Sequence, residues 1–228
     1  MIVASFWVHR PAEFPEAADY PAMLEILQRS CDRLELRHIC LTDQHTIVAH
    51  SDLWPKSVEA GMATRRGPLM QACTDAQARY LENAPEGEDV LFVGADCIMK
   101  RPPVYPDSVD LGVTYRRHDS KYPINTGAVF VRARARAAAA ALFRRIADRC
   151  GPVWCDDQRA IRAELEPMPR IHGEFMRAGL RVGFMPMKPY NVLPRDEGDS
   201  AGKAYMVHFR GRKRKQLFFD WAQRWGYA

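Results

Sequence analysis

Four short clusters of polar residues stand at the predicted ends of strands or at the start of a predicted helix. Asp96 directly follows the buried apolar run LFV, and ligands of open α/β sheets collect just beyond the carboxyl ends of the strands. We therefore expect Asp96 to contact a ligand. The arginine-rich second half of the chain favours a phosphate-bearing ligand, because guanidinium groups fit phosphate oxygens in pairs. The clusters are Gly94-Ala95-Asp96, Asn125-Thr126-Gly127, Asp157-Gln158, and His208 with the residues through Lys215.

Each cluster also has an ordinary structural explanation when it is taken alone. Asp96 could cap a turn, and Asn125-Thr126-Gly127 could be a plain turn. Asp156 and Asp157 could simply cap a helix, and His208 could be a core histidine. The basic run 210–215 could be a solvated charged face, a nuclear-targeting patch or a nucleic-acid contact. Its position directly after His208 favours a contact with a diphosphate, and the joint occurrence of the four clusters favours one shared site.

The elements that must position these clusters alternate between strands and helices. Short apolar runs rich in branched and aromatic residues predict buried strands, and longer amphipathic stretches predict helices. The predicted strands are IVASFWV at 2–8, LELRHICLTD at 34–43, the run ending at Val93, DLGVTY at 110–115, GAVFVRA at 127–133, GLRVGFM at 179–185 and AYMVHF at 204–209. The predicted helices are 17–34, 68–81, 135–148, one beginning at Asp156 and Asp157, and 216–225, in which Trp221 and Trp225 are expected to pack against the core.

Length and composition are those of a globular chain with one domain, residues 1–228. Apolar residues make up 47% and charged residues 27%, which excludes a mainly disordered chain. No apolar run approaches the roughly 18 to 20 residues of a membrane-spanning helix, and the first residues lack the pattern of a signal peptide, so we expect a cytoplasmic protein. The six cysteines are scattered without a CxxC pair, which predicts reduced, space-filling thiols.

In this order and at these intervals, the four clusters resemble the GT-A glycosyltransferases, and within them the families near glycosyltransferase family 8. That family has a hydrophobic strand ending in Asp-x-Asp, which Gly94-Ala95-Asp96 matches at its second acid. It also has an Asn-Ser/Ala-Gly step before a strand, an Asp-Gln pair that opens a helix, and a His-x-x-Gly segment followed by a basic residue. The matching residues are Asn125-Thr126-Gly127, Asp157-Gln158, and His208, Gly211 and Arg212 to Lys215. The resemblance spans most of the chain.

The resemblance implies an α/β protein with the GT-A fold, a Rossmann-like mixed central sheet flanked by helices. It implies transfer of a sugar, as by a hexosyltransferase, from a nucleotide-diphosphate donor such as a UDP-sugar, with retention at the anomeric carbon. A divalent cation, Mn²⁺ or Mg²⁺, would stabilise the departing diphosphate, and a carboxylate with an imidazole suits manganese better than calcium. The implied residues are Asp96 and His208 for the metal, Asn125, Thr126, Gly127, Gly211 and Lys213, Arg214 or Lys215 for the substrate, and Asp157 and Gln158 at the reaction centre.

Gly94 departs from the family pattern, because it replaces the first acid of Asp-x-Asp. One carboxylate fewer leaves any metal to Asp96 and His208 with more water ligands, or allows activity without metal. A catalytically silent nucleotide-sugar-binding protein is therefore an alternative. The net charge of +5 favours another alternative, in which the protein binds or glycosylates a nucleic acid. No recognition helix or RNA-binding motif supports a plain nucleic-acid-binding module. The sequence predicts no particular acceptor.

Overall fold

The computed structural model describes residues 1–10, 19–52, 54–55, 58–63, 67–117, 120–153, 155–210 and 214–228. Strands and helices alternate along the first half of the chain, as the sequence predicts. The strands are β1 (Ile2–Phe6), β2 (Arg37–Thr42), β3 (Glu59–Met62), β4 (Val90–Gly94), β5 (Cys97–Met99), β6 (Leu111–Tyr115), β7 (Ile124–Val131), β8 (Gly173–Arg177), β9 (Leu180–Pro186) and β10 (Met206–His208). The helices are α1 (Tyr20–Asp32), α2 (Gln44–Ala49), α3 (Leu69–Asn83), α4 (Arg136–Arg149), α5 (Asp156–Leu165), α6 (Met187–Tyr190) and α7 (Lys215–Arg224), with a 3-10 turn at Ala133–Ala135.

The central sheet has eight strands in the order β3-β2-β1-β4-β7-β6-β9-β8. Strand β1 is parallel to β2 and β4, and β6 is parallel to β9, whereas β7 runs antiparallel to both β4 and β6. A second sheet of two strands pairs β10 antiparallel with β5. This mixed sheet with flanking helices confirms the predicted α/β class.

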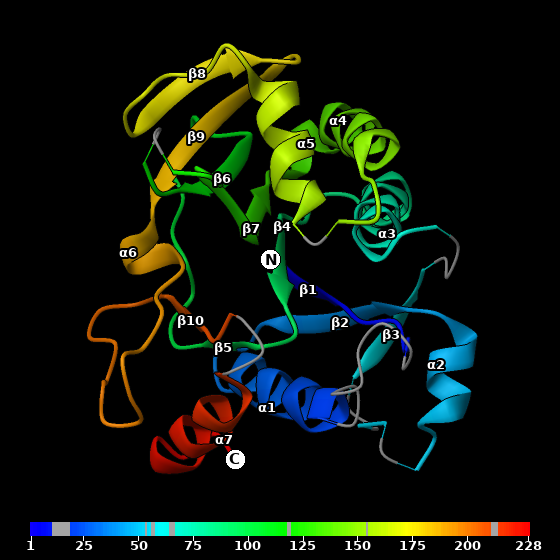
Figure 1. The fold of residues 1–228 in the computed structure, drawn as a ribbon, viewed down its shortest axis with the longest axis vertical. Helices are drawn as coiled ribbons and strands as arrows, with labels where there is room; N and C mark the ends of the chain where they lie inside the picture. Colours follow the sequence, from blue (N-terminus) through cyan, green and yellow to red (C-terminus); the bar gives the residue numbers. More distant parts are fainter. Residues whose placement is uncertain are drawn as a thin grey trace.

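Two apolar cores lie on the two faces of the sheet, because alternate residues of each strand point to opposite faces. Ile2 and Phe92 belong to the core beneath α3, α4 and α5. Val3 and Leu91 belong to the other core, where they meet Leu27 of α1. Figure 1 shows α3, α4 and α5 grouped together, and α1 with α7 at the opposite end of the view.

One edge of the sheet collects the predicted site residues. Strands β1 and β4 end at the same level, since Phe6 is paired with Gly94. Strand β7 runs in the opposite direction beside β4, so its first residues, 124–127, lie at this edge. The small second sheet adds His208, which is paired with Cys97 just beyond the end of β4.

The sequence predictions failed where elements have little apolar pattern. The stretch between β2 and α3, for which the sequence predicts neither a strand nor a helix, contains α2 and β3. Strand β3 pairs with β2 through backbone hydrogen bonds at the edge of the sheet, and both Glu59 and Ala60 are exposed. The edge strand β8 is likewise mostly exposed and was not predicted.

Two further expectations need correction. Asn125, Thr126 and Gly127 were expected to precede a strand or form a turn, but they lie inside β7, where Asn125 is paired with Thr114 of β6. Trp221 is fully buried as expected, whereas Trp225 is 39% exposed. Trp225 follows the last residue of α7, and its ring packs against that of Trp221 with the centroids 5.9 Å apart.

Candidate active site

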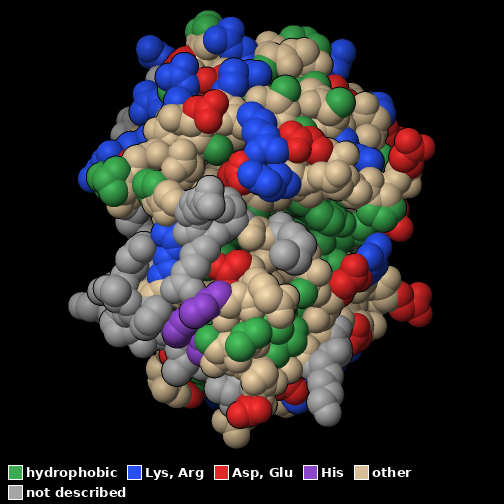
Figure 2. All heavy atoms as spheres, turned by 90° about the vertical axis from the view of Figure 1, so that its right-hand side faces the viewer, with side chains coloured by type: hydrophobic (Ala, Val, Ile, Leu, Met, Phe, Trp, Pro, Cys, Tyr) green, Lys and Arg blue, Asp and Glu red, His purple; other side chains and the backbone are tan. Residues whose placement is uncertain are grey.

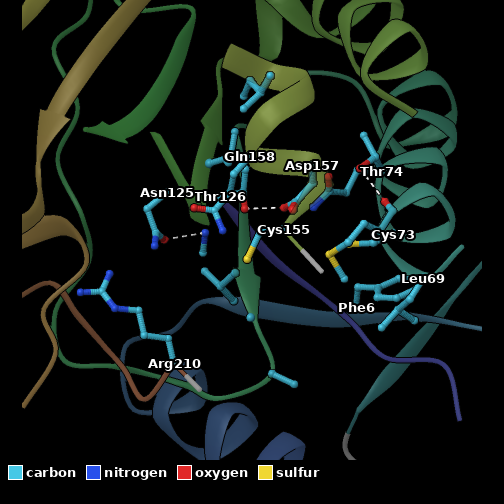
Figure 3. Close-up of a pocket in the computed structure, with 18 of the residues that line it drawn as sticks. Phe6, Leu69, Cys73, Thr74, Asn125, Thr126, Cys155, Asp157, Gln158 and Arg210 are labelled. Carbon is cyan, nitrogen blue, oxygen red and sulfur yellow. Dashed lines mark hydrogen bonds between the residues drawn. The ribbon is translucent and has the colours of Figure 1, made fainter. Parts of the chain in front are cut away.

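A cavity of about 1150 Å³ opens at this edge of the sheet. Trp7, after β1, and Tyr20, at the start of α1, line one end of it, and residues of β7 and α5 line the other. Figure 3 shows Thr126 and Asp157 facing each other across this second end. The cavity therefore spans four elements that are far apart in the sequence.

Asp96, His208 and Lys215 form a compact charged group in the middle of the cavity. The backbone N–H of Phe209 donates to the Asp96 carbonyl at 3.0 Å, which holds the two segments together. His208 Nε2 lies 3.3 Å from Asp96 Oδ1, and Lys215 Nζ lies 3.6 Å from Asp96 Oδ2. Burial alone would raise the pKa of Asp96, but the charges of His208 and Lys215 hold that pKa well below its usual range. The carboxylate is therefore ionised at neutral pH.

Asn191, which the sequence analysis missed, fixes the orientation of the His208 ring. The backbone N–H of Gly127 donates to Asn125 Oδ1 at 2.9 Å, so Asn191 must turn its NH₂ group toward that same oxygen, at 2.7 Å. Asn191 Oδ1 then lies 3.0 Å from His208 Nδ1 and accepts its proton. This chain of hydrogen bonds places a proton on Nδ1 and directs the other ring nitrogen, Nε2, at Asp96.

Gly127 is required by the position of this ring. A Cβ atom at residue 127 would lie 2.1 Å from His208 Cε1 and 2.8 Å from Asn125 Oδ1. Any side chain would therefore displace the imidazole or break the network. The glycine of the Asn125-Thr126-Gly127 cluster thus has a packing function beside the site.

Asp157 and Gln158 lie at the start of α5. Asp156 is the first residue of this helix, and its Oδ2 accepts from the backbone N–H of Val153 in the preceding turn at 3.1 Å. Thr126 Oγ1 donates to Asp157 Oδ2. Burial raises the pKa of Asp157, an effect that the Thr126 hydrogen bond partly offsets. Asp157 Oδ1 and Gln158 Oε1 are buried without a hydrogen-bond partner among the described residues, which is typical of atoms that await a ligand.

Asp96 and His208 are suited to hold a divalent cation. Their donor atoms and the thiol of Cys97 lie within 4.8 Å of one another. Cys97 is the weakest donor of the three, because burial and the adjacent charge of Asp96 raise its thiol pKa and its Sγ lies 3.9 Å from the Gly127 carbonyl oxygen. One carboxylate and one imidazole therefore fit a cation whose other ligands are oxygens from a diphosphate and water.

The remaining predicted substrate-binding residues belong to the basic segment after His208. Lys215 lines the cavity, but Arg214 is not among the lining residues and donates to the Pro194 carbonyl at 3.4 Å. Gly211 and Lys213 lie outside the described residues. Like Asn191, Trp7 and Tyr20 line or support the site but were not predicted from the sequence. Aromatic residues next to a strand or helix usually pack in the core.

Solved glycosyltransferases share this fold at low sequence identity. A glycosyltransferase involved in the glycosylation of the major capsid of PBCV-1 superposes with a TM-score of 0.62 at 14% identity, covering 96% of this chain and 100% of its own. The galactosyltransferase LgtC, solved with donor and acceptor sugar analogues, gives 0.55 at 11% identity over 98% and 95% of the two chains. Mouse xyloside xylosyltransferase 1 gives 0.51 at 9% identity over 91% and 96%.

The protein has the GT-A glycosyltransferase fold. No protein-family model and no curated protein matches its sequence. The GT-A fold therefore rests on shape and on the order of the strands. Among the described residues, no helix of this GT-A chain is long and apolar enough to cross a bilayer.

Gly94 occupies the position of the first acid in the Asp-x-Asp motif to which this GT-A chain was compared. A Cβ atom at Gly94 would lie 2.5 Å from Asp96 Oδ1 and 3.5 Å from His208 Nε2. The Asp96 carboxylate thus fills the space directly beside Gly94. A second carboxylate at this position would require Asp96 to move.

Proposed function

We propose that this protein is a glycosyltransferase that transfers a hexose from a nucleotide-diphosphate donor, a UDP-sugar in the first instance, to an acceptor hydroxyl. The observation that carries the proposal is that two groups of residues line the same cavity. One is Asp96 with His208 and Lys215, and the other is the hydrogen-bonded pair of Thr126 and Asp157. The first group suits a diphosphate, and the second suits the hydroxyl groups of a sugar.

The chemistry of the cavity walls supports one direction for the donor. Trp7 and Tyr20 stack with ring centroids 5.7 Å apart and form an aromatic end that suits a nucleoside. Lys215 Nζ lies 4.8 Å from the centre of the Tyr20 ring and 3.6 Å from Asp96 Oδ2, between the aromatic end and the middle of the cavity. A diphosphate next to Lys215 would extend the sugar toward Asn125 and Asp157.

In this arrangement Asp96 and His208 would hold Mn²⁺ or Mg²⁺. When bound, the cation would supply positive charge that stabilises the departing diphosphate. Lys215 supplies a further positive charge at the same place. Asn191 keeps His208 Nε2 directed at Asp96, so the two donor atoms are in position before a ligand arrives.

The transfer breaks the bond between the anomeric carbon and the β-phosphate oxygen, and the electron pair stays on the diphosphate. The acceptor oxygen forms the new bond to that carbon, and its proton passes to the departing phosphate oxygen. Asp157, with Oδ1 free, is positioned to accept a hydrogen bond from the sugar and to stabilise positive charge at the anomeric carbon. Gln158 would contact the sugar through its free Oε1. Attack from the diphosphate side retains the anomeric configuration.

Titration calorimetry with UDP, UDP-hexoses and GDP-hexoses, each with and without Mn²⁺, tests this function. We expect micromolar binding of one nucleotide class that strengthens with Mn²⁺, followed by slow release of UDP or GDP in the presence of water or a sugar acceptor. NMR of the product or of the released sugar reports the anomer. Absence of binding to every nucleotide sugar contradicts the proposal.

A catalytically silent binding protein is the second candidate, and Gly94 is the observation that favours it. Such a protein would bind the nucleotide sugar with the same residues but would not release the nucleotide. Measurable donor turnover that Asp96→Asn abolishes excludes it.

A nucleic-acid partner finds less support on the surface. Figure 2 shows Lys and Arg side chains gathered on the upper half of one face. Arg144, Arg145 and Arg149 of α4 are exposed or half-exposed, but each is paired with an acid on α3 or α5. These pairs reduce the positive field that a polyanion would meet. Weak DNA binding even at low salt would agree with this reading.

A further inference from the structure

Two arginines inside the cavity have no role in the donor site described above. Arg116 directly follows β6, and Arg210 follows His208 by two residues, and both line the cavity. Residues two apart in an extended segment point to the same side, which explains why Arg210 faces the cavity together with His208. Figure 3 shows Arg210 extending toward the side of the cavity on which Asn125 lies.

Neither guanidinium group is neutralised by the part of the chain that the structure describes. Arg116 Nη1 donates to the Tyr122 carbonyl at 3.3 Å, but its Nε is buried without a partner. Arg210 Nη1 is also buried without a partner. No described carboxylate forms an ion pair with either residue. By contrast, the exposed arginines of α4 each have an acidic partner.

The two positive charges also oppose each other. Arg116 and Arg214 lie close enough to Arg210 for their charges to repel its guanidinium group. Burial lowers the pKa of Arg116. Holding two unpaired cations together in a partly buried site costs stability, and such sites are found where an anion completes them.

The order of the strands places this pair beyond the reaction centre. Strand β1, which Trp7 follows, lies on one side of β4. Strand β7 lies on the other side of β4, and β6, which Arg116 follows, lies beyond β7. Arg116 is also close enough to Cys155, two residues before Asp157, to lower the pKa of that thiol against the effect of burial. A donor whose nucleoside lies at Trp7 and whose diphosphate lies at Asp96 would therefore point its sugar toward Arg116 and Arg210.

We infer that Arg116 and Arg210 form a subsite for a carboxylate or phosphate group on the sugar side of the reaction, carried by the transferred sugar or by the acceptor. The inference rests on the proposed function, because that function sets the direction of the donor. Paired guanidinium groups match the oxygens of either anion. The substrate class is thus an acidic sugar or a phosphorylated sugar, in place of a neutral one.

Matched probes distinguish the two sources of the anion. UDP-glucuronate and UDP-glucose differ in a single carboxylate and test the transferred sugar. Glucose 6-phosphate and glucose, each titrated into protein saturated with UDP, test the acceptor. We expect the charged member of one pair to bind about 10- to 100-fold more tightly than its neutral partner, as for other charge-assisted hydrogen bonds.

The variants Arg116→Gln, Arg210→Gln and the double variant should abolish this preference and leave the affinity for UDP within about twofold. Arg79→Gln is the control, since Arg79 is exposed on α3 and pairs with Asp75 outside the cavity. Arg210→Gln should also raise the melting temperature, because it removes an unpaired charge. A structural arginine would give the opposite shift.

Three results overturn the inference. Equal affinity for the charged and neutral members of both pairs, with UDP still bound, removes the anion subsite and leaves the proposed function intact. Loss of UDP affinity in the arginine variants would show that Arg116 and Arg210 contact the diphosphate of the donor. A protein that binds no UDP at all contradicts the proposed function and the subsite together.

Discussion

The middle of the cavity and its far end differ in how their buried polar atoms are paired. In the middle, Asp96, His208 and Asn191 each meet partners from other segments. At the far end, Asp157, Gln158 and the two cavity arginines keep buried atoms without partners in the described parts of the chain. The middle is therefore assembled without a ligand, whereas the far end has buried polar atoms that a ligand of the proposed kind would pair.

This difference separates stability from specificity. Loss of a residue from the paired group should weaken both folding and ligand binding, since it leaves other buried groups unsatisfied. Loss of a residue from the unpaired group should weaken turnover or selectivity and leave stability unchanged or improved. Each substitution below is a test of that division.

The largest effect is expected for Asp96→Asn. The change removes the negative charge shared by His208 and Lys215, so donor turnover should fall about 10³-fold and binding of UDP with Mn²⁺ should weaken. Assays of UDP release and calorimetry measure these two quantities. Asp110→Asn, on an exposed ion pair with Arg134 outside the cavity, is the control. Unchanged turnover would show that the paired group is not the reaction centre.

Asp157→Asn should lower turnover about 10²-fold while the affinity for UDP changes less than about twofold. The carboxylate faces the sugar in the proposed arrangement and does not touch the nucleotide. Asp156→Asn is the matched control next to it, and it should retain turnover but lose about 1 kcal/mol of stability because it weakens the hydrogen bond from Val153 and the ion pair with Arg159. A larger loss of turnover in Asp156→Asn than in Asp157→Asn would contradict the role proposed for Asp157.

His38 lies outside the cavity and tests how a buried, fully paired side chain makes stability depend on pH. It is buried on β2, with Nε2 2.9 Å from Ser5 Oγ and Nδ1 3.0 Å from Gln28 Oε1. Burial lowers its pKa from 6.5 to about 3, so between these values the unfolded chain binds a proton that the folded chain excludes. Stability should therefore fall by about 2 kcal/mol from pH 7 to pH 5 through this residue. Urea unfolding of wild type and His38→Gln at both pH values measures it, and an equal pH slope in the two proteins contradicts it.

The smallest effect is expected for Asn191→Leu. Loss of the acceptor for His208 Nδ1 should weaken Mn²⁺ binding in the presence of UDP about 10-fold, as for other partners of metal ligands. Asn191→Asp keeps an acceptor for His208 but cannot donate to Asn125, so it should retain more of the Mn²⁺ affinity. Electron paramagnetic resonance of bound Mn²⁺ provides the readout. Equal losses in the two variants would assign Asn191 to packing alone.

The sequence predicts the strands and helices that have a strong apolar pattern, and it predicts that Asp96 and His208 lie in one site. It does so because each cluster follows or precedes a recognisable element, and the ends of neighbouring strands meet at one edge. Strands β3 and β8 lack that pattern, since backbone pairing at the edge of a sheet requires no apolar side chain.

Asn191 and the two cavity arginines could not be identified from the sequence. Asn191 lies in a proline-rich segment with no motif, and its role arises only from its distances to Asn125 and His208. Arg210 was visible as part of a basic run, but the missing partner of its Nη1 atom is a property of three-dimensional packing.

The glycine at position 94 also determines what a second acid would do to this site. The carboxylate of Asp96 has taken the space beside Gly94, at 2.5 Å from where a Cβ atom would stand. A substitution of Gly94 by aspartate would therefore require the Asp96 carboxylate to turn away, at the expense of its contacts with His208 and Lys215. A second acid would thus compete with the two contacts that the single acid already makes.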